Sequence, residues 1–193
     1  DAMLDSGSVD MAILFRYDKP SNSDETLLTT ASTYLVSRPG LSLTHANTVE
    51  FRRLEGLPLV LPRRPAHWRA ILDETARSKG FHLQAAVEAD SLKVQKELIA
   101  DNPHLYALLG PNAFDEELRQ GRLYALLGPF SVDRELRMGR LQASKVIAPD
   151  LKRYVTLAQP KHGQVTQACR IVSQVIKEAV TSWNGHLTIP NKP

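Results

Sequence analysis

Cationic, hydroxyl and glycine–proline groups follow several predicted strands of this 193-residue chain. In chain order they are Arg16; Arg63, Arg64 and His67; Ser91; Gly110, Pro111 and Asn112; and Gly128, Pro129 and Phe130. Guanidinium groups bind carboxylates through paired N–H donors, and a helix N-terminus offers unpaired backbone N–H groups to an anion. If these places converge, they form a site for a small anion. The ordinary alternatives are surface salt bridges for the arginines and a plain helix cap for Ser91.

Motifs for nucleotide binding, metal binding and covalent catalysis are absent from the sequence. There is no Gly-x-Gly-x-x-Gly, no Gly-Lys-Ser/Thr and no Gly-x-Ser-x-Gly, and none of the 6 histidines has a partner at metal-ligand spacing. Cys169 is the only cysteine and lies in the final predicted helix, where a buried thiol is expected rather than a nucleophile. We therefore expect no metal, no cofactor and no enzymatic activity, with an enzyme of unrecognised type as the alternative.

Composition limits the class of protein. Apolar residues make up 42% of the chain and the net charge is only +3, so a folded core is expected rather than a disordered chain. No apolar run reaches membrane-spanning length, the start does not resemble a signal peptide, and a single cysteine excludes an internal disulfide. These features predict a cytoplasmic protein that does not contact a membrane. The basic residues occur in pairs, which is a weak signal for nucleic acid binding.

The elements that would position these groups follow an α/β pattern. Strand-length apolar runs alternate with segments of helical periodicity, as in units built around mostly parallel sheets. Strands are predicted at 9–15, 27–36, 57–61 and 81–87, and helices from Trp68 to Gly80, from Asp90 or Ser91 to about Ala100, and over the stripe 172–183. In the Trp68 helix, Asp73 is expected to pair with Arg77. The run 57–61 is apolar throughout, which is typical of a strand buried on both faces.

A tandem repeat occupies the middle of the chain. The segment 105–122 returns at 123–140, each copy with Leu-Tyr-Ala-Leu-Leu-Gly-Pro followed by an acidic and basic stretch. Two short copies do not make a solenoid, which needs at least three stacked units. The repeat is an extra strand and helix of the sheet, an insertion that bulges out, or a duplication in the sequence record.

The order of several motifs resembles the effector-binding domain of LysR-type transcriptional regulators. The segments that carry the resemblance are 4–13, 57–62, 88–92, the Tyr-Ala-Leu-Leu-Gly-Pro strand, 135–141 and 153–157, followed by the last amphipathic helix. This resemblance implies an α/β, periplasmic-binding-protein-like (type 2) fold with two subdomains and an effector in the cleft between two mostly parallel sheets. Subdomain I would comprise residues 1–57 and 161–193, and subdomain II residues 58–160.

The family resemblance also implies a function and a set of ligand contacts. It places the effector near Arg16, Arg64, His67 and Ser91 and near the residues after the repeated strand, with Gly128, Pro129 and Phe130 as the expected contacts. The effector would be a small, carboxylate-bearing metabolite that modulates DNA binding by the full-length protein, a homodimer or tetramer. A fragment of a periplasmic-type solute-binding protein is the alternative.

Two departures from the family pattern stand out. The family's effector domain begins with a strand, a helix and another strand, whereas this chain begins at the segment that follows them. The helix-turn-helix that would contact DNA lies further upstream in the family and is expected to be absent from this chain. The family has one Tyr-Ala-Leu-Leu strand and this chain has two. The first copy follows the expected helix from Ser91 to Ala100, and the second copy precedes the expected segment 141–144. Either copy could line the cleft.

Overall fold

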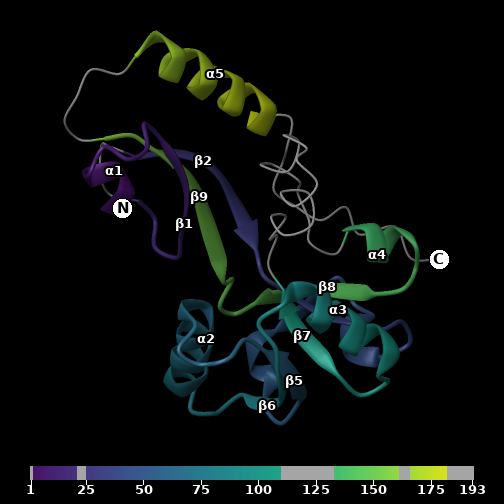
Figure 1. The fold of residues 1–193 in the computed structure, drawn as a ribbon. Helices are drawn as coiled ribbons and strands as arrows, with labels where there is room; N and C mark the ends of the chain where they lie inside the picture. Colours follow the sequence, from purple (N-terminus) through teal and green to yellow (C-terminus); the bar gives the residue numbers. More distant parts are fainter. Residues whose placement is uncertain (1, 21–24, 110–132, 161–165, 182–193) are drawn as a thin grey trace. The chain divides into compact units, whose positions relative to one another are not determined.

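The computed structural model describes residues 2–20, 25–109, 133–160 and 166–181, which form both helices and strands (Figure 1). These elements belong to two compact units. Of the described residues, those up to Ala31 and from Lys152 onward form unit 1, and those from Ser32 to Leu151 form unit 2. The predicted α/β class is confirmed, and each unit has a sheet of its own.

Unit 1 contains a three-stranded sheet and two helices. Its strands β1 (Ala12–Arg16), β9 (Lys152–Ala158) and β2 (Glu25–Ser32) lie in the order β1-β9-β2, and its helices are α1 (Ala2–Asp5) and α5 (Gln167–Thr181). Strand β1 pairs antiparallel with β9. Along α5, Cys169, Ser173 and Val180 are buried at a spacing that places them on one helical face. The thiol is therefore buried, as predicted for the cysteine of the final helix.

Unit 2 is built on a six-stranded sheet in the order β4-β8-β3-β7-β5-β6. These strands are β3 (Tyr34–Ser37), β4 (Thr48–Glu50), β5 (Pro58–Leu61), β6 (Gln84–Glu88), β7 (Tyr106–Leu109) and β8 (Gln142–Ile147). Short 3-10 helices, Ser42–Thr44 and Phe51–Leu54, flank β4, and α4 (Asp133–Arg137) precedes β8. Strand β5 pairs in parallel with both β6 and β7. The connection from β5 to β6 is α2 (His67–Ser78), and the connection from β6 to β7 is α3 (Leu92–Asp101).

Helix α2 forms where the sequence predicts it. Leu72 and Ala76, four residues apart, are fully buried on one face. The helix ends at Ser78. Two residues later, Gly80 has a φ of +78°, in the left-handed region, and the N–H of Phe81 bonds back to the Ala76 carbonyl at 3.1 Å. Glycine is needed here because a side chain strains this backbone conformation.

Helix α3 begins at a capping serine and lies against the sheet. The Ser91 hydroxyl accepts from the Val94 N–H at a long 3.5 Å, and the Ser91 carbonyl accepts from the Gln95 N–H at 3.0 Å. The predicted cap is confirmed. Further along, Ile99 is fully buried and packs in the core, so α3 contacts β5, β7 and β3.

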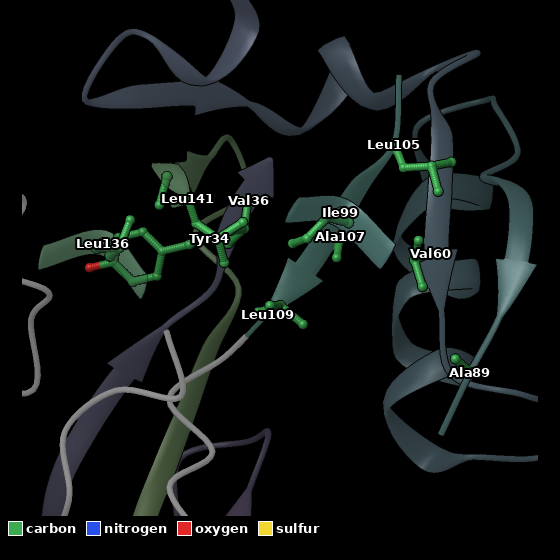
Figure 2. Packing of buried hydrophobic residues seen from close by; sticks show 11 residues of the cluster. Tyr34, Val36, Val60, Ala89, Ile99, Leu105, Ala107, Leu109, Leu136 and Leu141 are labelled. Carbon is green, nitrogen blue, oxygen red and sulfur yellow. The ribbon is translucent and has the colours of Figure 1, made fainter. Parts of the chain in front are cut away.

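The main core of unit 2 lies between α3 and one face of the large sheet (Figure 2). Its buried members are Tyr34, Val36, Val60, Ala89, Ile99, Leu105, Ala107, Leu109, Leu136, Leu141 and Ala143. The strand residues recur every second position, as one face of a sheet requires. Leu59 and Leu61 alternate with Val60 and are also fully buried, so the predicted burial of this strand on both faces is confirmed.

The sheets are mixed, which corrects the expectation of two mostly parallel sheets. Strand β3 runs antiparallel to β7 and β8, and β1 runs antiparallel to β9, whereas β4–β8, β5–β6 and β5–β7 are parallel pairs of described residues. The reason is the connectivity. A helical crossover returns the chain to the same end of the sheet, as α2 and α3 do, whereas β3 and β9 receive the chain directly from β2 and β8 in the other unit.

The two units also divide the chain at other positions than the sequence-based boundaries at 57/58 and 160/161. The divisions lie at 31/32 and 151/152, because β3 and β4 pair within the large sheet and β9 pairs with β1. The run 27–36, read as one β-rich segment, is two strands, with Thr33 between β2 and β3. Thr33 donates from its N–H and its hydroxyl to the Leu151 carbonyl at 3.1 and 2.9 Å, so the two crossing segments are bonded to each other.

The tandem repeat is described in part. The first copy supplies β7, which lies between β3 and β5, and the second copy supplies α4, which leads into β8. Residues 110–132, with the expected contacts Gly128, Pro129 and Phe130, lie outside the described residues. The same holds for the end of the apolar stripe at Trp183.

Candidate functional site

The carboxyl ends of β5 and β6 bring two of the sequence-predicted places together. The pairing of these strands continues past β6, where the Ala89 N–H donates to the Leu61 carbonyl at 2.9 Å. Directly beyond, the Arg63 N–H donates to Asp90 Oδ1 at 2.9 Å, and the Arg63 guanidinium lies 3.4 Å from Asp90 Oδ2. In the sheet, β6 lies on one side of β5 and β7 lies on the other, so the order of the strands reverses at β5. Open α/β sheets bind ligands beyond the carboxyl ends of their strands at such a reversal.

A buried arginine joins this edge to α2. The side chain of Arg69 is 3% exposed, and its Nε donates to both carboxylate oxygens of Asp73 at 3.1 Å. Its Nη1 donates to the Pro62 carbonyl at 3.0 Å and to Glu88 Oε1 at 2.9 Å. Arg69 thus connects the residue after β5, the last residue of β6 and the middle of α2, and it fixes the position of the segment that carries Arg63 and Arg64.

Arg64 shares the Asp73 carboxylate with Arg69. Its Nε and Nη2 donate to Asp73 Oδ2 at 2.9 and 2.7 Å. Burial disfavours the charged carboxylate, but hydrogen bonds from the two arginines outweigh this effect and hold the pKa of Asp73 below its usual value. The expected pairing of Asp73 with Arg77 is wrong, because Arg69 and Arg64 occupy Asp73 and Arg77 pairs with Glu74 on the exposed surface.

His67 and Ser91 lie at the starts of the helices that follow β5 and β6. His67 is the exposed first residue of α2, and Ser91 is the exposed cap of α3. One turn into α3, Lys96 Nζ bonds to Glu135 Oε1 of α4 at 2.8 Å, with both side chains largely buried. Helix α3 is thereby attached to α4 as well as to the sheet.

Arg16 belongs to unit 1, where an acidic side chain binds it. At the end of β1, its Nη2 donates to Glu25 Oε1 at 2.6 Å, and the hydroxyl of Thr156 donates to Glu25 Oε2 at 2.8 Å. The hydrogen bond from Arg16 holds the pKa of Glu25 below its usual value, with burial opposing and Thr156 assisting. In this structure Arg16 is therefore in an ion pair that joins β1 to β2.

In the structure Arg63, Arg64 and His67 follow β5 and Ser91 follows the neighbouring strand β6, at one edge of unit 2, whereas Arg16 lies in unit 1. Such an edge can bind an anion through guanidinium forks and helix N-termini. Among the described residues, no three histidine, cysteine or acidic side chains group as metal ligands would. No helix in the described part of the chain is long and apolar enough to cross a membrane.

The family assignment rests on the sequence itself. The family model described as LysR substrate binding domain matches residues 2–138. The chain belongs to this family. Among curated proteins, a comparison finds no match. The resemblance seen in the motif order is confirmed, and this LysR substrate-binding domain has the periplasmic-binding-protein-like (type 2) fold that it implies.

Solved structures of LysR proteins share this fold. The PA01 protein of Pseudomonas aeruginosa, assigned to the LysR family of transcriptional regulators, has 17% identity and a TM-score of 0.66 over 93% of this chain and 57% of its own. The regulatory domain of CcmR from Synechocystis, in complex with 2-PG, has 11% identity and a TM-score of 0.64 over 94% and 78%. The effector binding domain of QuiR, in complex with shikimate, has 11% identity and a TM-score of 0.64 over 94% and 77%.

Sequence reasoning missed two buried arginines of the LysR substrate-binding domain. Arg69 was signalled only by its four-residue spacing from Asp73, which fits one helix face. Arg153 of β9 is buried in unit 1, where its guanidinium lies 5.3 Å from the ring centre of Tyr17. Burial lowers the pKa of Arg153 and raises the pKa of Tyr17. No local sequence pattern predicts the contact between Arg153 and Tyr17, because β9 and the end of β1 meet only in the folded sheet.

The Arg16–Glu25 pair predicts a pH dependence of stability. Because the pKa of Glu25 is lower in the folded state, its contribution is complete above the unfolded value of 4.5 and is lost as the pH falls through the folded value. We expect Glu25→Gln to lower the free energy of unfolding by about 2 kcal/mol at pH 7, and this difference to shrink below about pH 4. Urea unfolding between pH 3 and 7 measures both quantities.

The matched control for this prediction is Glu178→Gln in α5 of the same unit. Glu178 is exposed, and the side-chain amide of Gln174 on the same helix donates to its Oε1 at 2.7 Å. It should change the free energy of unfolding by less than about 0.5 kcal/mol at either pH. A Glu25→Gln difference that stays constant from pH 7 to pH 3 would contradict the role of the ionised pair.

Proposed function

We propose that this chain is the effector-sensing domain of a LysR-type transcriptional regulator. It binds a small, carboxylate-bearing metabolite at the carboxyl ends of β5 and β6, without transforming it. The observation that carries this proposal is the contact of Arg63, which precedes Arg64, with Asp90, which precedes the α3 cap Ser91, on one edge of a parallel strand pair. Guanidinium groups and helix N-termini both favour a negatively charged ligand.

Two structures of domain–ligand complexes support the class of ligand. CcmR is bound to 2-PG and QuiR to shikimate, both in domains of this fold. Shikimate carries a carboxylate, which fits the two-donor geometry of an arginine side chain. The family assignment favours this function over that of a transport component with a similar fold.

The effector acts by shifting populations. A ligand that binds one arrangement of the domain more tightly than another favours that arrangement by its differential affinity. In the full-length regulator, a cytoplasmic homodimer or tetramer, this shift changes how the DNA-binding domains are presented. DNA contacts then come from a helix-turn-helix outside this chain.

Calorimetric titration of the chain with a panel of small organic acids, including shikimate and 2-PG, tests the proposal. We expect at least one acid to bind, and Arg64→Ala to weaken that binding about tenfold, because a hydrogen bond to a charged group contributes about 1.5 kcal/mol or more. Ser91→Ala should weaken it less, since only the helix cap changes. The control is Arg77→Ala on the last turn of α2, which should leave the affinity unchanged.

Arg16 is tested separately, because it belongs to unit 1 and is paired with Glu25. A weaker titration with Arg16→Ala would assign it to the ligand as well. The proposal fails if no acid in the panel binds, or if Arg64→Ala, Arg16→Ala and Ser91→Ala all bind as tightly as the unaltered chain.

A further inference from the structure

We propose that Asp73 is an internal competitor for Arg64, so that an effector carboxylate binds by taking Arg64 from Asp73. This inference rests on the proposed function, because it concerns the same edge of unit 2. It assigns Asp73 a role in setting affinity that is separate from direct contact with the ligand.

The geometry of Asp73 is that of a carboxylate held by two arginines. Arg69 Nε contacts both of its oxygens, and Arg64 contacts Oδ2 with two donors at 2.9 and 2.7 Å. Arg64 thus already makes the contact that it would make with a ligand carboxylate, with two N–H donors directed at one acid.

The two arginines differ sharply in exposure. The side chain of Arg69 is 3% exposed and is also bonded to Glu88 and to the Pro62 carbonyl, so it is fixed. The side chain of Arg64 is 68% exposed, on the segment that follows β5. An exposed ion pair contributes little because water solvates both partners and screens their attraction. Arg64 can therefore leave at small cost, whereas Arg69 cannot.

Release of Arg64 leaves no isolated buried charge. Asp73 is 15% exposed, and without any partner its ionised form would be costly to bury. Arg69 remains on both of its oxygens, so the carboxylate stays compensated after Arg64 has gone. The exchange replaces one arginine–carboxylate pair with another, and the site opens without disrupting α2.

Removing the competitor should strengthen binding. We expect Asp73→Asn to bind a carboxylate probe, shikimate or 2-PG, about twofold to fivefold more tightly than the unaltered chain, the factor that corresponds to an exposed ion pair. The matched control is Glu74→Gln, the next residue of α2, which removes the same charge but pairs with Arg77. It should leave the affinity roughly unchanged.

Two outcomes of this titration would overturn the inference. Weaker binding by Asp73→Asn would mean that Asp73 orients Arg64 for the ligand. An equal gain for Asp73→Asn and Glu74→Gln would mean that only the net charge of the helix matters. Thermal unfolding of both variants, measured alongside, shows whether the asparagine variant retains the fold.

A second measurement needs no substitution at Asp73. In the unaltered chain, the ¹⁵N–¹H signals of the Arg64 and Arg69 Nε groups can be followed while the probe is added. We expect the Arg64 signal to shift with saturation and the Arg69 signal to stay, because only Arg64 changes partner. An Arg64 signal that does not move while the probe binds would contradict the exchange.

Failure of the proposed function is distinguishable from failure of this inference. If no acid binds the unaltered chain, the proposed function is contradicted. Titration of Asp73→Asn then tests separately whether Asp73 competes with a ligand carboxylate for Arg64. Binding that appears in Asp73→Asn and disappears in the double variant with Arg64→Ala supports the role of Asp73 as a competitor. Continued absence of binding in Asp73→Asn overturns that role.

Discussion

Arg69→Ala is expected to lower the free energy of unfolding of the domain by about 3 kcal/mol. Removal of one partner from a buried ionic cluster costs about 3–5 kcal/mol, because the remaining charge has no counterpart. Here Arg64 still compensates Asp73, which favours the lower end of that range. The Pro62 carbonyl and Glu88 also lose a donor at the edge of the sheet.

Urea unfolding measures this effect, with the fluorescence of Trp68 as a probe in a background in which the second tryptophan is replaced, Trp183→Phe. Trp68 is buried in α2 beside Arg69, so its signal reports the helix in which the substitution is made. The midpoint should fall while the slope of the transition stays the same. Arg77→Ala, which breaks an exposed pair on the same helix, should change the free energy by less than about 0.5 kcal/mol. Equal effects of the two variants would show that Arg69 is not a structural centre of the edge.

Ile99→Ala is expected to cost about 3–4 kcal/mol. Ile99 is fully buried between α3 and the sheet, in the cluster that includes Val60 and Ala107 (Figure 2). Truncation of a buried isoleucine removes favourable burial and leaves a cavity, and such losses range from about 2 to 5 kcal/mol. The substitution tests whether packing of α3 on β5, β7 and β3 holds the Ser91 cap in place.

The control for the core prediction lies on the same helix. Val94 is 47% exposed, and Val94→Ala should change the free energy of unfolding by less than about 0.5 kcal/mol. If Ile99→Ala were as mild as Val94→Ala, α3 would not depend on this core. Crystal structures or NMR spectra of both variants would show whether the Ser91 region moves when the core is altered.

Local patterns predicted much of unit 2. The fully apolar run of β5, the four-residue spacing of α2, the left-handed glycine at Gly80 and the cap at Ser91 are each determined by neighbouring residues. These features depend on steric limits of the backbone and on hydrogen bonds within a few residues. Both can be predicted from the types of neighbouring residues. The motif order added the family, which the match to residues 2–138 confirms.

Local sequence patterns could not predict the ion-pair partners of the charged side chains. Asp73 has arginines at both plausible helical spacings, and local spacing alone cannot decide between Arg69 and Arg77. The choice depends on Glu88 and the Pro62 carbonyl, which approach Arg69 from other strands and secure it in the interior. Arg16 was recognised as a cation after a strand, but its pairing with Glu25 depends on β2 and β9 lying in one sheet with β1.

The sequence by itself determined the α/β class, the positions of most helices and strands and the LysR family, because these follow from short-range periodicity and from motif order. Only the tertiary structure decided the mixed direction of the strands, the division of the chain at 31/32 and 151/152, and the pairing of Asp73 with two arginines. Each of these depends on contacts between residues that are distant in the chain. Such contacts are selected by the packing of whole elements, and no single segment encodes them.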